Sequence, residues 1–134
     1  MSEQRFEERK QELKDAVLRL EEAIAQPEND MIRDSVIQRF EFSFELAWKT
    51  LQLYLERQGL EAGSPRQALK SAFAQGIISS EDEADVWLKM QEDRNLTTHT
   101  YNEDLAKAIY KRIATTYVER FRAISDSIQK LTWK

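Results

Sequence analysis

Apolar side chains recur every three to four residues in five stretches of the chain, a period that predicts five α-helices. The first stretch has an apolar residue at each turn behind a highly charged start: Leu13, Val17, Leu20 and Ile24. Pro27 closes it. The second stretch opens at Asn29 or Asp30, either of which can cap a helix, and ends at Gly59, a residue type common just past helix ends.

The third and fourth stretches carry their own start signals. Ser64 followed by Pro65 is a cap with proline at the first helical position, and this short helix ends at Gly76. Ser80 with Glu83 has the pattern of a capping box, in which each side chain bonds the other residue's backbone. The helix that follows runs towards Arg94 through apolar residues at helical spacing: Val86, Trp87 and Met90.

The last stretch predicts one long helix capped by Asn102. Its apolar stripe is Ile109, Ile113, Tyr117, Ile124, Ile128 and Leu131. No internal repeat, low-complexity tract or linker interrupts the pattern. We therefore expect an all-α, up-and-down helical bundle of about five helices, one of them short, forming a single domain over residues 1–134.

The second predicted helix has two apolar sides. One side predicts core: Ile37, Phe40, Phe44, Trp48, Leu51 and Leu55. Phe42, Leu46 and Leu53 project from roughly the opposite side. Either this helix is central and wrapped by the others, or the second side is the interface of a homodimer or of another partner, because exposed apolar stripes usually mark association surfaces.

Amino-acid composition and net charge limit the fold type and the kinds of function further. Of 134 residues, 41% are hydrophobic and 33% charged, with 3 glycines and 2 prolines, which favours solvated helices over sheet. The absence of cysteine excludes disulfides and thiolate chemistry, and with the charged N-terminus and lack of a long apolar run it predicts a cytoplasmic protein without membrane spans. A net charge of -4 argues against a general nucleic-acid coat.

The segment RNLTTHTYNE holds the only histidine, His99, among hydroxyls and amides. A lone histidine is most often structural or merely solvated. Here Arg94 precedes it, and an arginine fork can hold a phosphate while an imidazole transfers a proton. Five residues on an unbroken helix give about 140° of rotation. The two side chains therefore converge only if the chain bends at Thr97 and Thr98, or if a second copy completes the site.

This segment resembles the HEPN domains (higher eukaryotes and prokaryotes nucleotide-binding), whose hallmark is an arginine, usually a polar residue after it, and a histidine after four to six residues. Arg94, Asn95 and His99 fit that pattern, and Tyr101 completes the motif of HEPN subunits paired with minimal nucleotidyltransferases. RDSVIQRFEFSFELAWKTLQLYLERQG and RNLTTHTY are also similar to the nucleotidyltransferase substrate-binding proteins of this group.

The resemblance implies a dimeric bundle with two motifs facing one cleft, and a small nucleotidyltransferase as partner. It implies a metal-independent ribonuclease toxin that needs no cofactor. Arg94 would stabilise charge on the RNA phosphate, His99 would act as general acid or base, and Asn95 would position one of them. The partner would silence the toxin by transferring AMP to Tyr101.

Charge around the motif is mixed. Four acidic residues make its flanks negative: Glu92, Asp93, Glu103 and Asp104. The last helix offsets them with five cations: Lys107, Lys111, Arg112, Arg120 and Arg122. Lys107, Lys111 and Arg122 fall within about 60° on an ideal helix, which makes either an RNA-tracking stripe or an ordinary solvated face. Along the second helix, Arg39, Glu41, Glu45 and Lys49 either pair with one another or dock a partner.

Three hypotheses follow. The chain is a ribonuclease toxin, a non-catalytic subunit that binds nucleotide or substrate for a separate nucleotidyltransferase, or a purely structural helical dimer. The motif favours the first two, because a structural role requires neither an arginine fork nor a titratable imidazole. It does not separate the first from the second.

Overall fold

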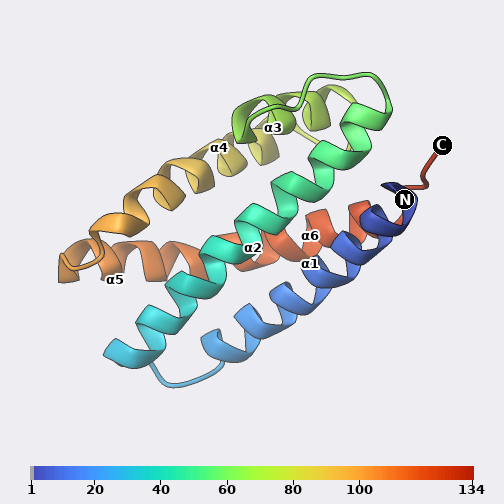
Figure 1. Cartoon of the computed structure of the whole chain (residues 1–134). Helices are drawn as coiled ribbons and strands as arrows, with labels where there is room; N and C mark the ends of the chain where they lie inside the picture. Colours follow the sequence, from blue (N-terminus) through green and yellow to red (C-terminus); the bar gives the residue numbers. More distant parts are fainter. Residues whose placement is uncertain (1) are drawn as a thin grey trace.

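A computed structural model describes residues 2–134, and all the regular structure in this range is helical, which confirms the all-α prediction. Six α-helices are separated by loops and by two short turns of other helical types. In chain order, the α-helices and the two turns are α1 (Ser2–Ile24), α2 (Asp30–Arg57), α3 (Pro65–Ala74), α4 (Glu81–Leu96), a 3₁₀ turn (Thr97–His99), α5 (Glu103–Arg112), a π-helical turn (Ile113–Tyr117) and α6 (Val118–Gln129) (Figure 1).

The helix boundaries follow the polar caps that the sequence predicts. A side-chain oxygen accepts a hydrogen bond from a backbone N–H of the first turn at each of four starts: Asn29, Ser64, Ser80 and Asn102. Gly59 and Gly76 adopt positive φ angles of 80° and 78° just past α2 and α3, a conformation that is costly for residues with a Cβ. Local chemistry therefore sets where these helices begin and end.

Half of the predicted capping box is wrong. The Ser80 hydroxyl accepts from the backbone N–H of Glu83 at 3.1 Å, as expected. The Glu83 carboxylate does not reach back to Ser80, because it accepts a 2.7 Å hydrogen bond from Arg120 of α6 instead. A long-range ion pair has replaced the local contact.

The predicted last helix is also interrupted. α5 and α6 form one rod, but residues 113–117 between them make i→i+5 hydrogen bonds, so that the rod contains a π-helical turn. Such turns insert one extra residue into an α-helix and change which side chains share a face. Counting α5 and α6 as one rod, residues 2–134 fold into five rods, of which α3 is short.

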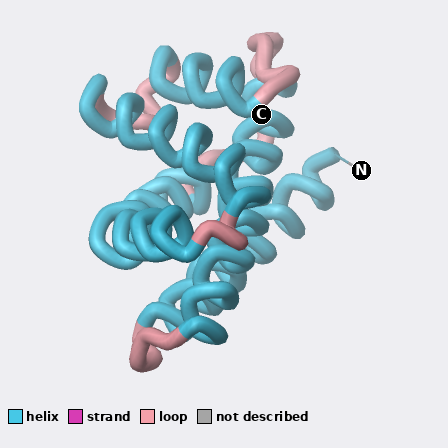
Figure 2. The backbone as a smooth tube through the Cα atoms, turned by 90° about the vertical axis from the view of Figure 1, so that its left-hand side faces the viewer, coloured by secondary structure: helices cyan, strands magenta, loops and turns pink. Residues whose placement is uncertain are grey.

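The rods run up and down, with α2 at the centre. α1 and α2 lie side by side in opposite directions, and the α5–α6 rod passes behind them (Figure 1). Figure 2 views the bundle from the left-hand side of Figure 1 and shows the loops at the ends of the rods. α2 packs against α1, α3, α4, α5 and α6, which agrees with the interpretation that it is a central, wrapped helix.

The core is an aromatic cluster around α2. The Phe40 ring lies 5.6 Å from Tyr117 and 6.0 Å from Phe121, between ring centroids. Trp87 of α4 meets Phe121 edge to face at 5.5 Å, a favoured geometry for aromatic pairs. The residues predicted to form the core side of α2 are buried except Trp48, which is half-buried at the edge of the core.

The core reaches further towards the N-terminus than the charged start of the sequence suggests. Phe6 is fully buried, with its ring 6.0 Å from Tyr54 and 5.3 Å from Trp133. Lys10, one turn later, is buried as well, and its ammonium donates a 2.6 Å hydrogen bond to the carbonyl of Leu131. These contacts tie the two ends of the chain together.

Candidate functional site

Arg94 lies in the last turn of α4, and its guanidinium is directed towards α2. Nη1 lies 3.3 Å from Oε2 of Glu41, and Nε lies 3.8 Å from Oε1 of Glu45. Nη1 also donates a 3.3 Å hydrogen bond to Oγ1 of Thr97. The side chain is only 27% exposed. The motif arginine is therefore held by two carboxylates that are about fifty residues away in the sequence.

The helix breaks between Arg94 and His99. α4 ends at Leu96, and a tighter 3₁₀ turn carries the chain to His99. Threonine hydroxyls stabilise this break, because Thr97 Oγ1 donates to the Arg94 carbonyl at 2.7 Å and Thr100 Oγ1 donates to the Thr97 carbonyl at 3.1 Å. Such side-chain to backbone bonds compete with a regular helix. The bend that the sequence suggested at the threonines is present.

His99 and Tyr101 form an exposed pair just beyond this break. The Tyr101 hydroxyl lies 3.5 Å from Nδ1 of His99, and the two rings meet edge to face with centroids 5.9 Å apart. Tyr101 is 85% exposed, more than any other large apolar or aromatic side chain of residues 3–134. Both the imidazole and the phenol are open to a solute.

Within one copy, the arginine and the histidine of the motif have separate surroundings. In the part of the chain that the structure describes, Arg94 makes no hydrogen bond or ion pair with His99. The side chain of Asn95 is exposed, and the backbone carbonyl of Asn95 accepts a 3.5 Å hydrogen bond from the Thr98 hydroxyl. The bend alone thus leaves the two charged groups in contact with different neighbours.

A hollow of about 240 Å³ adjoins Tyr101. It lies between the α4–α5 junction and the first turn of α2, and it is lined by Asp30, Arg33, Asp34, Thr100, Tyr101, Glu103 and Ala106. Arg33 is buried and donates to Asp30 at 2.9 Å and to Glu28 at 3.1 Å. The hydrogen bond to Asp30, above all, raises the pKa of Arg33. The wall beside Tyr101 therefore carries a fixed cation among acids.

The residue before the motif arginine has a structural role that sequence reasoning missed. Asp93 is 0% exposed, and its carboxylate accepts two hydrogen bonds from Arg112, at 2.7 and 2.8 Å. The Tyr117 hydroxyl donates a third, at 2.5 Å. The prediction that Asp93 adds to the negative charge flanking the motif is wrong, because its carboxylate is buried and paired with a guanidinium.

The π-helical turn explains how both partners reach Asp93. Arg112 and Tyr117 are five residues apart, so on a regular α-helix they would point about 140° apart. The i→i+5 turn between them brings the two side chains to one face of the rod, where α4 packs. No pattern in the sequence marks this turn. The acid beside the motif and an arginine 19 residues later were the only available signals.

The predicted RNA-binding cations do not share one environment. Lys107 pairs with Glu103 at 3.2 Å within α5, Lys111 is exposed, and Arg122 forms an ion pair with Glu21 of α1. Two other cations of this rod are also paired, Arg112 with Asp93 and Arg120 with Glu83. The rod therefore presents less free positive charge than its composition suggests.

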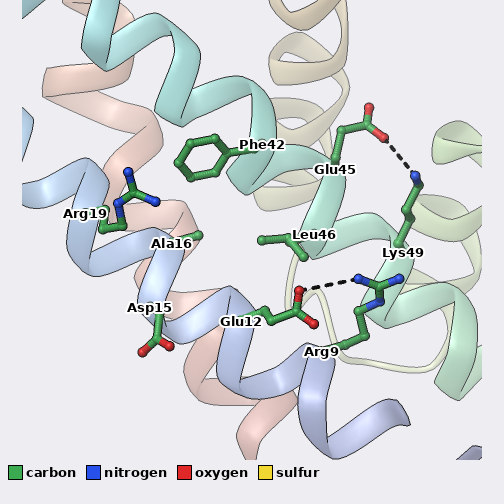
Figure 3. A pocket seen from close by; sticks show the side chains of 9 residues that line it. All are labelled: Arg9, Glu12, Asp15, Ala16, Arg19, Phe42, Glu45, Leu46 and Lys49. Carbon is green, nitrogen blue, oxygen red and sulfur yellow. Dashed lines mark hydrogen bonds and ion pairs between the residues drawn. The ribbon is translucent and has the colours of Figure 1, made fainter.

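The predicted second side of α2 faces a groove beside α1. Phe42 and Leu46 are half-buried and point into this groove, which has a volume of about 450 Å³ and is lined on α1 by residues from Arg9 to Arg19 (Figure 3). The Arg19 guanidinium lies over the Phe42 ring, 5.4 Å from its centroid. Leu53 is half-buried further along α2 and lies outside the groove.

The other charged residues of α2 have distinct partners. Glu45 pairs with Lys49 at 3.7 Å, as one of the two sequence interpretations expects (Figure 3). Arg39 donates a hydrogen bond to the backbone carbonyl of Arg19, and Glu41 turns to Arg94. Glu45 thus borders both the groove and the motif arginine.

Across residues 2–134, no three His, Cys, Asp or Glu side chains stand close enough together to hold a metal ion. None of the helices described has both the length and the apolar composition that a membrane crossing requires.

Comparisons with known proteins place these features in context. A family model described as "Nucleotidyltransferase substrate binding protein like" matches residues 8–130. A Haemophilus influenzae protein described as probable ribonuclease HepT is 28% identical over 95 residues, covering 67% of this chain and 63% of its own length. The chain thus spans less than two thirds of that relative. The crystal structure of a Thermus thermophilus protein is 38% identical and matches 88% of this chain and 99% of its own, with a TM-score of 0.81.

Proposed function

The chain belongs to the nucleotidyltransferase substrate-binding protein family and is of the HEPN type, and from this premise we propose that it is the HEPN subunit of a toxin–antitoxin pair with a minimal nucleotidyltransferase. Its activity in this proposal is metal-independent cleavage of RNA in the cytoplasm. The observation that carries the proposal is the α4–α5 junction, which places the Arg94 guanidinium and the exposed His99–Tyr101 pair on either side of one helix break.

In the proposed reaction, each group has a defined task. Arg94 holds the scissile phosphate and stabilises the charge that builds on it, because an arginine fork matches phosphate oxygens. His99 removes the proton from the ribose 2′-hydroxyl or gives one to the leaving oxygen. Asn95, exposed beside Arg94, positions one of these groups. Of the three predicted cations Lys107, Lys111 and Arg122, the exposed Lys111 guides the RNA backbone, and the other two do so when they leave Glu103 and Glu21.

A second candidate function is supported by the separation of Arg94 from His99 within one copy. A non-catalytic subunit that binds nucleotide or substrate for the nucleotidyltransferase requires no joint action of the two side chains. The ribonuclease proposal instead requires them to meet at the substrate, through an RNA strand that spans both or through the facing copy in a dimer.

Expression without the nucleotidyltransferase tests the two candidates. The native chain should stop growth and degrade RNA, and the purified protein should cleave RNA in excess chelator. His99→Ala should lower the cleavage rate by about 10²–10⁴-fold and keep a near-native melting temperature, because the imidazole is exposed. Arg94→Ala should abolish toxicity. Thr98→Ala, in the same turn, is the control that should stay active. Cleavage by His99→Ala at the native rate would leave the substrate-binding subunit as the better hypothesis.

A further inference from the structure

The guanidinium of Arg94 cannot bind a phosphate bidentately as it stands. Nη1 is already engaged by Glu41 and by the Thr97 hydroxyl, each at 3.3 Å. Nε is buried without a hydrogen-bond acceptor, since the nearest carboxylate oxygen, on Glu45, lies 3.8 Å away. A bidentate grip needs two neighbouring N–H groups of the fork. A phosphate can therefore bind two neighbouring N–H groups of the fork only if the guanidinium moves or a carboxylate leaves.

The two carboxylates differ in how firmly they are held. Glu45 accepts a 3.2 Å hydrogen bond from the Trp48 indole and lies 3.7 Å from the Lys49 ammonium, so it has partners other than Arg94. Arg94 is the ion-pair partner that the structure gives Glu41. Both acids stand on a stretch of α2 anchored in the core by Phe40 and Phe44. The Glu41 carboxylate is thus held by its ion pair with Arg94, whereas the Glu45 carboxylate has further partners.

We propose that Glu41 and Glu45 are positioning residues of the motif, which hold Arg94 against α2 and compete with an RNA phosphodiester for its guanidinium. Glu45 keeps Arg94 at the helix break, and Glu41 is the anion that an incoming phosphate displaces from Nη1. The ligand class in this proposal rests on the proposed function. Carboxylate and phosphate make similar charge-assisted hydrogen bonds to arginine. The apparent affinity for RNA is therefore proportional to the fraction of molecules in which no carboxylate occupies the Arg94 guanidinium.

The test measures binding rather than cleavage. In a His99→Ala background, a fluorescein-labelled single-stranded RNA is titrated with protein at fixed salt. Adding Glu41→Gln, which keeps the size and removes the charge, should lower the Kd about fivefold, as expected for loss of one partly exposed ion pair. Glu45→Gln should lower it in the same direction, and it serves if Glu41→Gln does not fold.

A general loss of negative charge would also favour RNA, so two controls separate it from an effect through Arg94. Glu92→Gln removes a carboxylate from α4 that is exposed and pairs with Lys89 at 3.6 Å. It should leave the Kd nearly unchanged. In an Arg94→Ala background, Glu41→Gln should have no effect.

The competing results are distinct. An equal gain from Glu92→Gln, a gain that persists without Arg94, an unchanged or higher Kd, or no RNA binding by any variant would each overturn the competition. A purely structural role predicts a lower melting temperature with no Arg94-dependent change in Kd, which would overturn it as well. Absence of cleavage by the native chain, with Arg94-dependent RNA binding intact, would overturn only the ribonuclease proposal.

Discussion

Tyr101 is the residue at which the proposed partner would act. Its hydroxyl is exposed, lies 3.5 Å from His99 Nδ1 and borders the hollow beside Arg33. In AMP transfer, the phenol oxygen attacks the α-phosphate of ATP, the phenol loses its proton and pyrophosphate leaves. The product places a bulky anion against the imidazole, so we expect inhibition to be both steric and electrostatic.

The prediction at this residue is site-specific labelling. Incubation with the nucleotidyltransferase and ATP should add AMP mass to the peptide that contains Tyr101, and Tyr101→Phe should stay unlabelled because it lacks the acceptor oxygen. Tyr110→Phe, a half-buried tyrosine of α5, is the control and should label normally. Mass spectrometry that finds the label on a serine or threonine, or equally on Tyr101→Phe, would show that Tyr101 is not the acceptor.

At the residue scale, the sequence identified candidate side chains for the site but not the residues that contact them. Arg94 and His99 are recognisable in the sequence because an arginine fork and a single imidazole lie close together in a polar segment, where they can bind a phosphate and transfer a proton. The carboxylates of Glu41 and Glu45 could not be assigned to Arg94, since that pairing depends on how α2 and α4 cross. Asp93 was misjudged for the same reason, because burial is decided by the rod that covers it.

At the element scale, the π-helical turn fixes α4 next to the motif arginine through contacts to Asp93. It aligns Arg112 and Tyr117 so that both bind Asp93, the residue next to Arg94. The hydrogen bond to Asp93 raises the pKa of Arg112. Burial, and then the hydrogen bond to Asp93, raise the pKa of Tyr117 above its ordinary value of 10.0.

This raised pKa predicts how stability depends on pH. The folded chain keeps the Tyr117 proton at pH values where the unfolded chain loses it. The stabilisation is therefore full below about pH 10 and is lost as pH rises beyond that value. Tyr117→Phe cannot ionise, so it should cost about 1 kcal/mol near neutral pH and progressively less above about pH 10.

Urea unfolding of the native chain and of Tyr117→Phe, near neutral pH and again above about pH 10, measures this difference. Tyr110→Phe, on the same rod, reports the effect of removing a hydroxyl that does not contact Asp93. A gap between native and Tyr117→Phe that is equal at both pH values would contradict the assignment of the alkaline loss to Tyr117.

At the element scale, local rules predicted most of the helix boundaries. Asn29, Ser64, Ser80 and Asn102 act within three residues of the backbone groups that they cap, so a linear sequence contains the required information. Glu83 departed from its capping role because Arg120, 37 residues later, offers an ion pair. The π-helical turn was missed because an apolar stripe does not register a single extra residue.

At the scale of the whole molecule, the groove between α1 and α2 connects association with the motif. Phe42 and Leu46 are half-buried there, and Glu45 on its rim also lies 3.8 Å from Arg94. A second copy seated on this face would therefore come close to the motif. That arrangement would bring two motifs near one another, as the ribonuclease proposal requires when Arg94 and His99 do not meet in one copy.

We therefore predict a homodimer in dilute solution that uses the second side of α2. Asp at Leu46 or Leu53 should weaken association by about 3 kcal/mol, because a charge would be desolvated at the contact. Leu18→Asp is the matched control, since Leu18 is 52% exposed and stands on α1 rather than on the second side of α2. Sedimentation at micromolar concentration should give a dimer for the native chain and for Leu18→Asp, and a monomer for the variants of α2.

Leu46 also packs against the core, so the folded state must be checked separately. A variant that is monomeric and keeps a cooperative melting transition would place Leu46 or Leu53 at the interface, whereas one that loses the transition would be an unfolded chain. Leu53 is the stronger probe, because it is not among the residues packed against the core. A native chain that sediments as a monomer would contradict the predicted homodimer. The motif would then have to join Arg94 and His99 through the bound RNA alone.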